Sequence, residues 1–281
     1  MGDFAPLSTI QSSPVIFSSK PKNDRDSRPA VDLDRLVDKG TSPNTVLFLH
    51  GLFGTPEHYA EVMDRLSDHY RVIAPQLPID QQPGRRLNGM QTVADLSETV
   101  EDLIKTLELD QFVLCGNSLG GLVAIDLCLR QPGYAKGLVL AGSAGLFERS
   151  PIRGLRSRPT REFVKKTVTG ILYDRSLVSE DLIDHWHAAV MDRDYVRFLL
   201  RVSRATRDRS VERELASLDL PTIIIWGSED EITPPATGEE FQRLIRGSQL
   251  KFIDHCGHAP NWEKPTEFAE LLEEFLPSCF A

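Results

Sequence analysis

The most informative segment for predicting the fold is Gly-Asn-Ser-Leu-Gly-Gly at residues 116–121. An apolar run at 112–115 precedes it, and an apolar run with helical spacing at 122–129 follows it. The pattern predicts a strand, a sharp turn and a helix, with Ser118 at the tip of the turn. Gly116 and Gly120 favour so tight a turn because neither carries a Cβ atom. Gly-x-Ser-x-Gly alone fits an ordinary turn, but this strand-to-helix setting favours Ser118 as a nucleophile.

A serine nucleophile needs a base to accept its proton and an acid to orient that base. The β-branched run at 222–226 predicts a buried strand that ends at Gly-Ser-Glu-Asp, and we expect Asp230 to be the acid. A second strand-like run at 250–253 leads into Asp-His-Cys-Gly-His, and we expect His258 to be the base. Three candidate residues therefore follow three predicted strands in the order Ser118, Asp230, His258.

Each partner has a rival close by in the sequence. Glu229 adjoins Asp230 and is also compatible with a solvated turn. Asp254 competes for the orienting role, although it lies only four residues before His258. His255 competes with His258 as the base. The glycine at 257 favours His258, because it gives the loop backbone freedom to bring the ring to the serine.

The run at 46–49 predicts a buried strand that ends in His-Gly-Leu-Phe-Gly at 50–54. Glycines in this loop let the backbone turn so that an N–H group can face a developing negative charge. We expect the backbone N–H groups of Leu119 and Leu52 to form this oxyanion hole, with Phe53 as the alternative to Leu52. The competing interpretation is a plain turn between a strand and a loop.

Together, the motifs at 50–54, 116–121, 226–230 and 257–265 resemble those of the α/β-hydrolase superfamily, in the branch that carries a cap. The resemblance covers residues 44–277. It implies an α/β fold with a mostly parallel central sheet, helices on both faces and a helical cap inserted after strand six. It says little about the substrate, because one fold hosts many reactions.

Within this superfamily, Gly-Asn-Ser and Cys-Gly-His are similar to the meta-cleavage-product hydrolases, which cut carbon–carbon bonds. That resemblance implies that Asn117 and Cys256 lie near the site. Esterase-like members carry the same residues, and Asn117 could instead fill the turn while Cys256 packs as a small apolar residue. One departure concerns the pocket wall, since Gln76 replaces the usual acid and a proline-rich stretch up to residue 86 replaces a glycine loop.

The domain organisation follows from the alternation of predicted elements. We expect residues 1–43 to form a tail or an edge hairpin, with strand-like runs at 14–17 and 30–33. The hydrolase core is expected at 44–145 and 219–281, and the cap at 146–218. In the core, apolar spacing predicts helices at 59–66, 93–107 and 266–276, and a strand at 137–141.

Residues 146–215 contain 15 Lys and Arg against 11 Asp and Glu, so the predicted cap is more basic than the rest of a chain with net charge −9. Four arginines follow one side of a predicted helix: Arg193, Arg197, Arg201 and Arg204. They are compatible with a solvated face. Alternatively one of them, or an arginine at 153, 156 or 158, enters the pocket and holds a substrate carboxylate.

Composition limits the partners. A net charge of −9 argues against nucleic acid, and no apolar run approaches the ~20 residues that span a bilayer. The first 19 residues lack the pattern of a signal peptide, and the four cysteines form no metal-binding pair, so we expect a cytoplasmic protein. No phosphate-loop, dinucleotide or zinc motif occurs, and the expected chemistry needs neither a cofactor nor a metal. The sequence leaves the oligomeric state open.

The residues and the resemblance lead to one expectation and two alternatives. We expect Ser118, His258 and Asp230 to hydrolyse a small or medium carboxylic ester or another activated carbonyl compound. The first alternative is carbon–carbon bond hydrolysis of a dienoic keto acid, a meta-cleavage product. The second is a ligand receptor without turnover, because some members of this fold use the cap as a switch.

Overall fold

A mixed seven-stranded sheet organises the computed structural model, which describes residues 31–79, 92–149, 152 and 159–281. The strand order is β1-β3-β2-β4-β5-β6-β7, with β1 antiparallel to β3 and all other neighbours parallel. The strands are β1 Val37–Lys39, β2 Asn44–Leu49, β3 Arg71–Ala74, β4 Gln111–Asn117, β5 Gly137–Ala141, β6 Thr222–Gly227 and β7 Gln249–Ile253. This confirms the predicted, mostly parallel central sheet.

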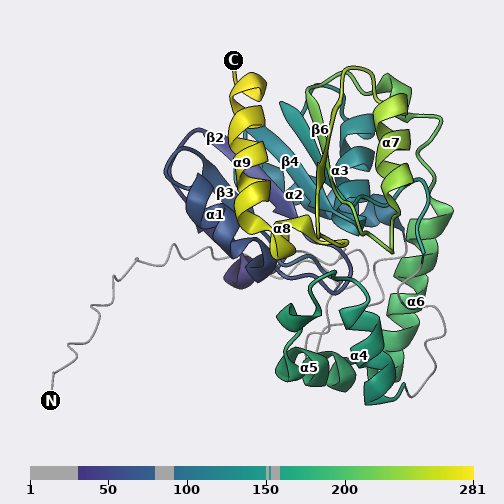
Figure 1. Cartoon of the computed structure of the whole chain (residues 1–281). Helices are drawn as coiled ribbons and strands as arrows, with labels where there is room; N and C mark the ends of the chain where they lie inside the picture. Colours follow the sequence, from purple (N-terminus) through teal and green to yellow (C-terminus); the bar gives the residue numbers. More distant parts are fainter. Residues whose placement is uncertain (1–30, 80–91, 150–151, 153–158) are drawn as a thin grey trace, which may run out of the picture.

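Helices cover both faces of the sheet, because successive strand residues point to opposite sides. In β2, Val46 and Phe48 pack into one apolar core, whereas Leu47 and Leu49 pack into the other. Figure 1 shows α1 and α9 together on one face, and α3 and α7 on the other. The core helices are α1 Ala60–Leu66, α2 Val93–Thr106, α3 Leu119–Arg130, α7 Pro235–Leu244, α8 Pro260–Glu263 and α9 Pro265–Phe275.

The parallel register brings the ends of several strands to one edge. Leu49 at the end of β2 pairs with Gly116 in β4, and Gly227 at the end of β6 pairs with Ile253 of β7. The loops that follow these strands therefore meet at the carboxyl edge, which is where open α/β sheets bind their ligands. All the motifs singled out in the sequence follow strands at this edge.

The N-terminal region differs from expectation. Residues 31–33 do not form a strand; Asp32 instead caps a short 3-10 helix, Leu33–Arg35, by accepting a hydrogen bond from the N–H of Asp34. The edge strand β1 begins only at Val37. The expected strand-like run at 14–17 lies outside the described residues.

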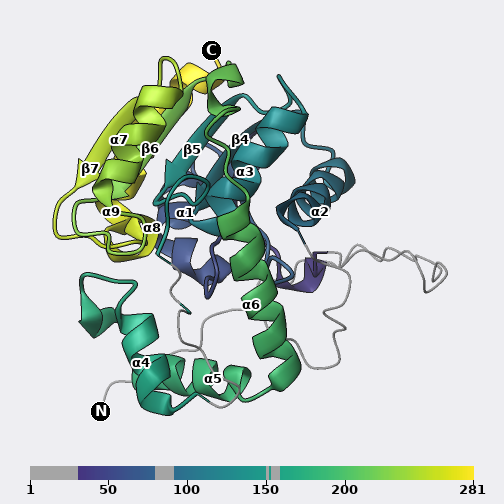
Figure 2. The ribbon, with the colours of Figure 1, turned by 90° about the vertical axis from the view of Figure 1, so that its right-hand side faces the viewer.

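Three helices lie between β5 and β6 in the sequence: α4 Arg161–Thr169, α5 Glu180–Val190 and α6 Arg193–Asp208. We call residues 159–208 the insertion. It lies beyond the carboxyl edge of the sheet (Figures 1 and 2). Five described strands precede it where six were expected; residues 1–30 and 80–91 lie outside the described part of the chain.

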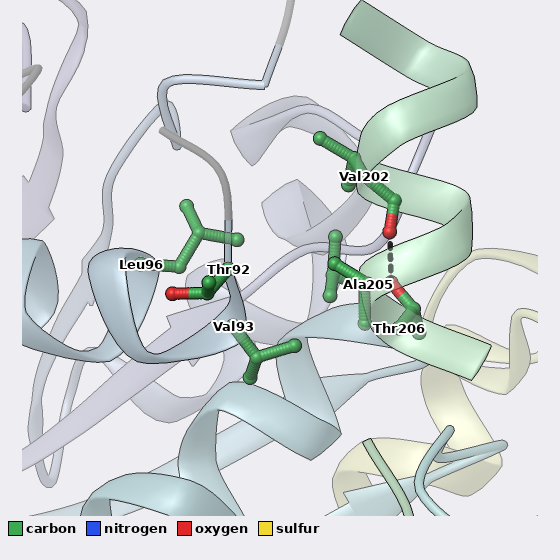
Figure 3. A pocket seen from close by; sticks show the side chains of 7 residues that line it. Thr92, Val93, Leu96, Val202, Ala205 and Thr206 are labelled. Atoms are coloured by element: carbon green, nitrogen blue, oxygen red, sulfur yellow. Dashed lines mark hydrogen bonds between the residues drawn. The ribbon is translucent and has the colours of Figure 1, made fainter. Parts of the chain in front are cut away.

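Helix α6 connects the insertion to the core. Its apolar side is buried, and Asp192 caps its start by accepting hydrogen bonds from the N–H groups of Asp194 and Tyr195. Figure 3 shows Val202 and Ala205 of α6 facing the start of α2 across a small apolar gap. Among the described helices, none combines the length and the apolar character needed to cross a membrane.

Candidate active site

Ser118 occupies a strained turn between β4 and α3. Its φ is 54° and its ψ is −118°, a conformation that non-glycine residues rarely adopt. The turn is held by the main chain: the N–H of Ser118 donates to Ala141 O at 3.0 Å, and its carbonyl accepts from Leu122 and Ala144. The serine side chain therefore stands at the sheet edge on a rigid support.

Close packing explains the glycines around this serine. A Cβ atom at Gly120 would lie 2.0 Å from the carbonyl oxygen of Leu49, and one at Gly116 would lie 2.3 Å from the carbonyl oxygen of Gly120. Both contacts are with backbone, which cannot move aside as a side chain can. Only glycine lets α3 approach the strands this closely.

His258 and Asp230 form a buried pair at the same edge. Nδ1 of His258 lies 2.8 Å from Oδ2 of Asp230, and both side chains are almost fully buried. Oδ1 of Asp230 accepts from the N–H groups of Ile232 and Thr233 at 2.8 and 2.9 Å, while Oδ2 also accepts from the Thr233 hydroxyl. These donors fix the carboxylate, so Asp230 can orient the imidazole.

The charge of this pair also affects His258. Burial alone would lower the pKa of the imidazole, but the charge and hydrogen bond of Asp230 outweigh it and raise the pKa above 6.5. The charges of Glu148 and Glu263 act in the same direction. A base with its pKa near the working pH is suited to moving a proton in both directions.

The rival residues are engaged elsewhere. Glu229 accepts a hydrogen bond from the N–H of Cys256 at 2.9 Å, and Asp254 accepts one from the hydroxyl of Ser228 at 2.9 Å. His255 is exposed, and its Nδ1 lies 3.2 Å from the hydroxyl of Tyr173. Of the competing residues, only Asp230 and His258 form a buried acid–imidazole pair.

Asn117 brings the His258 loop next to the serine turn. Its amide nitrogen donates to Ala141 O and to His258 O, both at 2.9 Å. Both amide hydrogens are thus used within the protein, which favours the turn-filling role over substrate contact. Ser118 follows Asn117 directly. The Ser118 hydroxyl donates to no residue that the structure describes.

The loop after β2 lies against the serine. A Cβ atom at Gly51 would be 2.9 Å from the Cβ of Ser118, and Phe53 takes a left-handed conformation with φ 64°. No described acceptor binds the N–H of Leu52 or Phe53. The N–H of Leu119 is the first of α3, where a helix offers no internal acceptor. Within the described part of the chain, no acceptor is bound to any of the three N–H groups expected to form the oxyanion hole.

His50 has a structural role that the sequence did not reveal. Its Nδ1 donates to Gly51 O at 2.9 Å, and its Nε2 accepts from the N–H of Leu77 and from the side-chain amide of Gln76, both at 3.0 Å. Burial lowers the pKa of His50 to about 4, so the ring is neutral and can accept. Because the His50 ring is neutral, its Nε2 can accept a hydrogen bond from the side-chain amide of Gln76. This hydrogen bond connects the loop after β2 to the loop after β3. The sequence feature that indicated this contact was Gln76, which stands where the family usually has an acid.

The basic residues of α6 face outward. Arg193, Arg197 and Arg201 are all exposed, and Arg197 forms an ion pair with Asp194 at 2.6 Å. Arg201 and Arg204 line an open surface groove of about 440 Å³ beside the start of α2. The arginines at 153, 156 and 158 lie outside the described residues. In the described ranges, no cluster of three or more His, Cys, Asp or Glu side chains could hold a metal ion.

A model of the alpha/beta hydrolase family matches residues 46–271. The chain belongs to the alpha/beta hydrolase family. The match spans every strand from β3 to β7, and most of β2, together with the turn that carries Ser118 and the loop that carries His258. This confirms the fold expected from the sequence, and the protein is a hydrolase.

Relatives of this alpha/beta hydrolase include enzymes of two kinds. It is 30% identical over 251 residues to 2-hydroxy-6-oxo-2,4-heptadienoate hydrolase of Pseudomonas putida, covering 83% of this chain and 89% of the relative. The structure of a meta-cleavage product hydrolase from Pseudomonas fluorescens IP01 has 25% identity and a TM-score of 0.75, covering 86% of this chain and 93% of the other. A thermophilic esterase from Thermogutta terrifontis, at 23% identity, a TM-score of 0.71 and coverage of 88% and 93%, shares the fold.

Proposed function

We propose that this alpha/beta hydrolase is a serine hydrolase in which Ser118 is the nucleophile, His258 the general base and Asp230 the orienting acid. The observation that carries the proposal is the buried bond between His258 and Asp230, placed beside the serine turn by the Asn117 amide. A fixed acid, a base with a raised pKa and an accessible hydroxyl at one sheet edge fit acyl transfer.

The reaction proceeds in two halves. Ser118 Oγ attacks the substrate carbonyl while His258 takes its proton, and the oxyanion is held by the N–H groups of Leu119 and of Leu52 or Phe53. His258 then protonates the leaving alcohol, which departs and leaves an acyl-serine. A water molecule gives its proton to His258 and attacks the acyl group. The tetrahedral intermediate then breaks its bond to Ser118 Oγ, His258 returns the proton to that oxygen, and the acid product leaves.

The proposed substrate is a small or medium ester with an apolar portion. Phe53, next to the proposed oxyanion donors, packs edge-on against Trp186 of α5 with ring centroids 4.7 Å apart, so the wall between the loop and the insertion is apolar. Of the arginines expected to hold a carboxylate, Arg193, Arg197 and Arg201 are exposed on α6, and those at 153, 156 and 158 lie outside the described residues. Both observations favour an uncharged substrate.

Carbon–carbon bond hydrolysis of a dienoic keto acid is the second candidate. Similarity to the 2-hydroxy-6-oxo-2,4-heptadienoate hydrolase of Pseudomonas putida and to the meta-cleavage product hydrolase of Pseudomonas fluorescens favours it. We further propose that residues 146–218 act as a cap over the core at 44–145 and 219–281. We also propose that the protein works in the cytoplasm, since its four cysteines are unpaired thiols.

Replacing Ser118 with alanine tests the nucleophile. We expect Ser118→Ala to lose nearly all turnover of p-nitrophenyl butyrate while keeping its melting temperature, because only the attacking oxygen is removed. A fluorophosphonate probe should label the wild type and Ser278→Ala, a control at the far end of the chain, but not Ser118→Ala. Full activity in Ser118→Ala would end the assignment, and an unlabelled wild type without turnover would favour the receptor alternative.

A substrate comparison separates the two hydrolase candidates. We expect a higher kcat/KM for neutral nitrophenyl esters than for a yellow dienoic keto acid or for esters that carry a carboxylate. Arg201→Ala should change none of these ratios. Preference for the keto acid, lost in Arg201→Ala, would establish the carbon–carbon hydrolase and an arginine clamp instead.

A further inference from the structure

Glu263 contacts both the loop that carries His258 and the insertion. Its Oε1 accepts a hydrogen bond from the N–H of Gly257 at 2.9 Å, directly before His258. Its Oε2 accepts from the N–H groups of Tyr173 at 2.7 Å and Asp174 at 3.1 Å, which lie between α4 and α5. One buried carboxylate therefore accepts hydrogen bonds from three backbone N–H groups, one at residue 257 and two at residues 173 and 174.

The same two segments touch through a further bond. The N–H of His258 itself donates to Ile171 O at 2.9 Å. A Cβ atom at Gly257 would lie 2.6 Å from the nitrogen of Tyr173 and 2.9 Å from Ile171 O. The main chain of residues 257–258 thus lies directly against residues 171–174, and Gly257 leaves the space for this contact.

We propose that Glu263 is a positioning residue that fixes the His258 loop against the insertion, and so couples docking of the insertion to the placement of the general base. The inference rests on the proposed function, because it assigns a task to His258. Glu263 reaches no reacting atom; it acts through the backbone of residues 257 and 258.

A glutamate suits this position for a reason of hydrogen-bond chemistry. An ionised carboxylate offers acceptors on both oxygens, one for each segment. Glutamine would keep one acceptor and turn an N–H₂ group toward the other segment, where only N–H donors lie. Aspartate would keep both acceptors and the charge, but its carboxylate would end one methylene short of the donors.

Glu263 also affects the charge state of the base. Three acids face His258: Asp230 in the turn after β6, Glu148 in the loop after β5 and Glu263 in α8, and each raises the pKa of the imidazole. Burial raises the pKa of Glu263 itself, against the hydrogen bonds from backbone N–H groups that lower it. Glu263→Gln removes the negative charge and one of the two accepting oxygens. Glu263→Asp keeps the charge and both oxygens, but the carboxylate no longer reaches the backbone donors.

The experiment compares Glu263→Gln and Glu263→Asp with Glu267→Gln, which removes an exposed charge one turn away in α9. For a neutral nitrophenyl ester, we expect both changes at 263 to lower kcat roughly tenfold to a hundredfold with little effect on KM. The acid limb of the pH–rate profile should move to lower pH in Glu263→Gln and stay in place in Glu263→Asp. Glu267→Gln should match the wild type in kcat, in KM and in the position of the acid limb.

Amide hydrogen exchange tests the inference without turnover. In the wild type, the amides of Gly257, Tyr173 and Asp174 should lose protection together as the pH falls and Glu263 becomes protonated. Independent exchange of the three amides, or wild-type kinetics in both variants at 263, would overturn the inference. Joint exchange in a protein that lacks esterase activity would instead leave the coupling intact and overturn the proposed function.

Discussion

Asp230 accepts three hydrogen bonds besides that of the imidazole, from the N–H groups of Ile232 and Thr233 and from the Thr233 hydroxyl. Its carboxylate is therefore oriented before any substrate arrives, and no ordering is needed during the reaction. The Thr233 hydroxyl also lies 3.2 Å from Nδ1 of His258. At the residue scale, the proposed catalytic pair is held by groups that the sequence motif does not include.

Replacing Asp230 with asparagine should lower kcat by a factor of about 10⁴, because an amide N–H₂ facing Nδ1 favours the wrong tautomer of the ring. The loss of the carboxylate charge should also shift the acid limb of kcat/KM, which in the wild type is expected above pH 6.5, to lower pH. A pH–rate series on a nitrophenyl ester measures both. Asp254→Asn, which alters an exposed residue bound to Ser228, serves as the control.

The sequence predicted that Ser118, Asp230 and His258 follow strands, and they do follow β4, β6 and β7, whereas their catalytic roles stay a prediction. The bonds of Glu263 were not predictable in the same way, although Glu263 lies inside a quoted motif. Its partners Tyr173 and Asp174 belong to a distant loop whose position depends on how the insertion folds. The same holds for His50, whose acceptor role depends on Leu77 and Gln76.

At the scale of elements, the junction of β2, β4 and α3 has no spare space. The first turn of α3 rests on the end of β2, so that Gly120 faces the carbonyl of Leu49. The strained φ of Ser118 is sustained by this contact and by the bond from Ser118 to β5. A methyl group added at Gly120 would therefore have to displace the backbone of Leu49.

Gly120→Ala should therefore destabilise the protein by about 3 kcal/mol or more, since overpacking against backbone leaves no easy relaxation. Gly133→Ala is the matched control: its φ is +79° and nothing lies within 4 Å of the added Cβ, so only the backbone conformation is strained. That cost should be about 1 kcal/mol. Urea unfolding of both variants gives the comparison, and equal losses would show that the contact with Leu49 matters little.

The predictable elements are those with strong apolar patterns. The expected strand at 137–141 coincides with β5, and the expected helices at 93–107 and 266–276 match α2 and α9 to within one residue at each end. No helix was predicted at α7, Pro235–Leu244, where two prolines and Gly238 weaken the helical signal. There the fold itself supports the helix, because Gly238 packs against the indole of Trp226.

At the scale of the whole molecule, the loops around the site are joined by aromatic stacking. His58, after the loop that follows β2, stacks on Trp262 of α8 with ring centroids 4.0 Å apart and planes 7° from parallel. Burial, followed by the charge of His50, lowers the pKa of His58 to about 4. Both histidines are therefore neutral in the folded protein at neutral pH.

Neutral histidines make the stability of the fold sensitive to acid. The folded pKa of His58, about 4, lies below the ordinary 6.5, so as the pH falls the unfolded chain takes up the proton first. The resulting stability is present above pH 6.5 and is lost as the pH falls toward 4, by up to about 3 kcal/mol. His58→Phe keeps an aromatic ring on Trp262 and should reduce this loss in urea unfolding between pH 7 and 4. The exposed His69→Phe is the control, and equal slopes in both would contradict the assignment.

The chain that leaves the insertion meets the core at a charged junction. Nε and Nη2 of Arg209, just after α6, donate to the buried Oδ1 of Asp126 in α3 at 3.3 and 3.2 Å, and the same guanidinium binds Glu214. Asp126 belongs to the helix that begins at Ser118. Another set of helices could replace the insertion between β5 and β6, in an engineered chimera or through evolution. It would then need a cationic side chain at the position of Arg209. Without it, the buried carboxylate of Asp126, on the helix that begins after Ser118, would keep only the more distant Arg130, whose Nη1 lies 3.9 Å from its Oδ2.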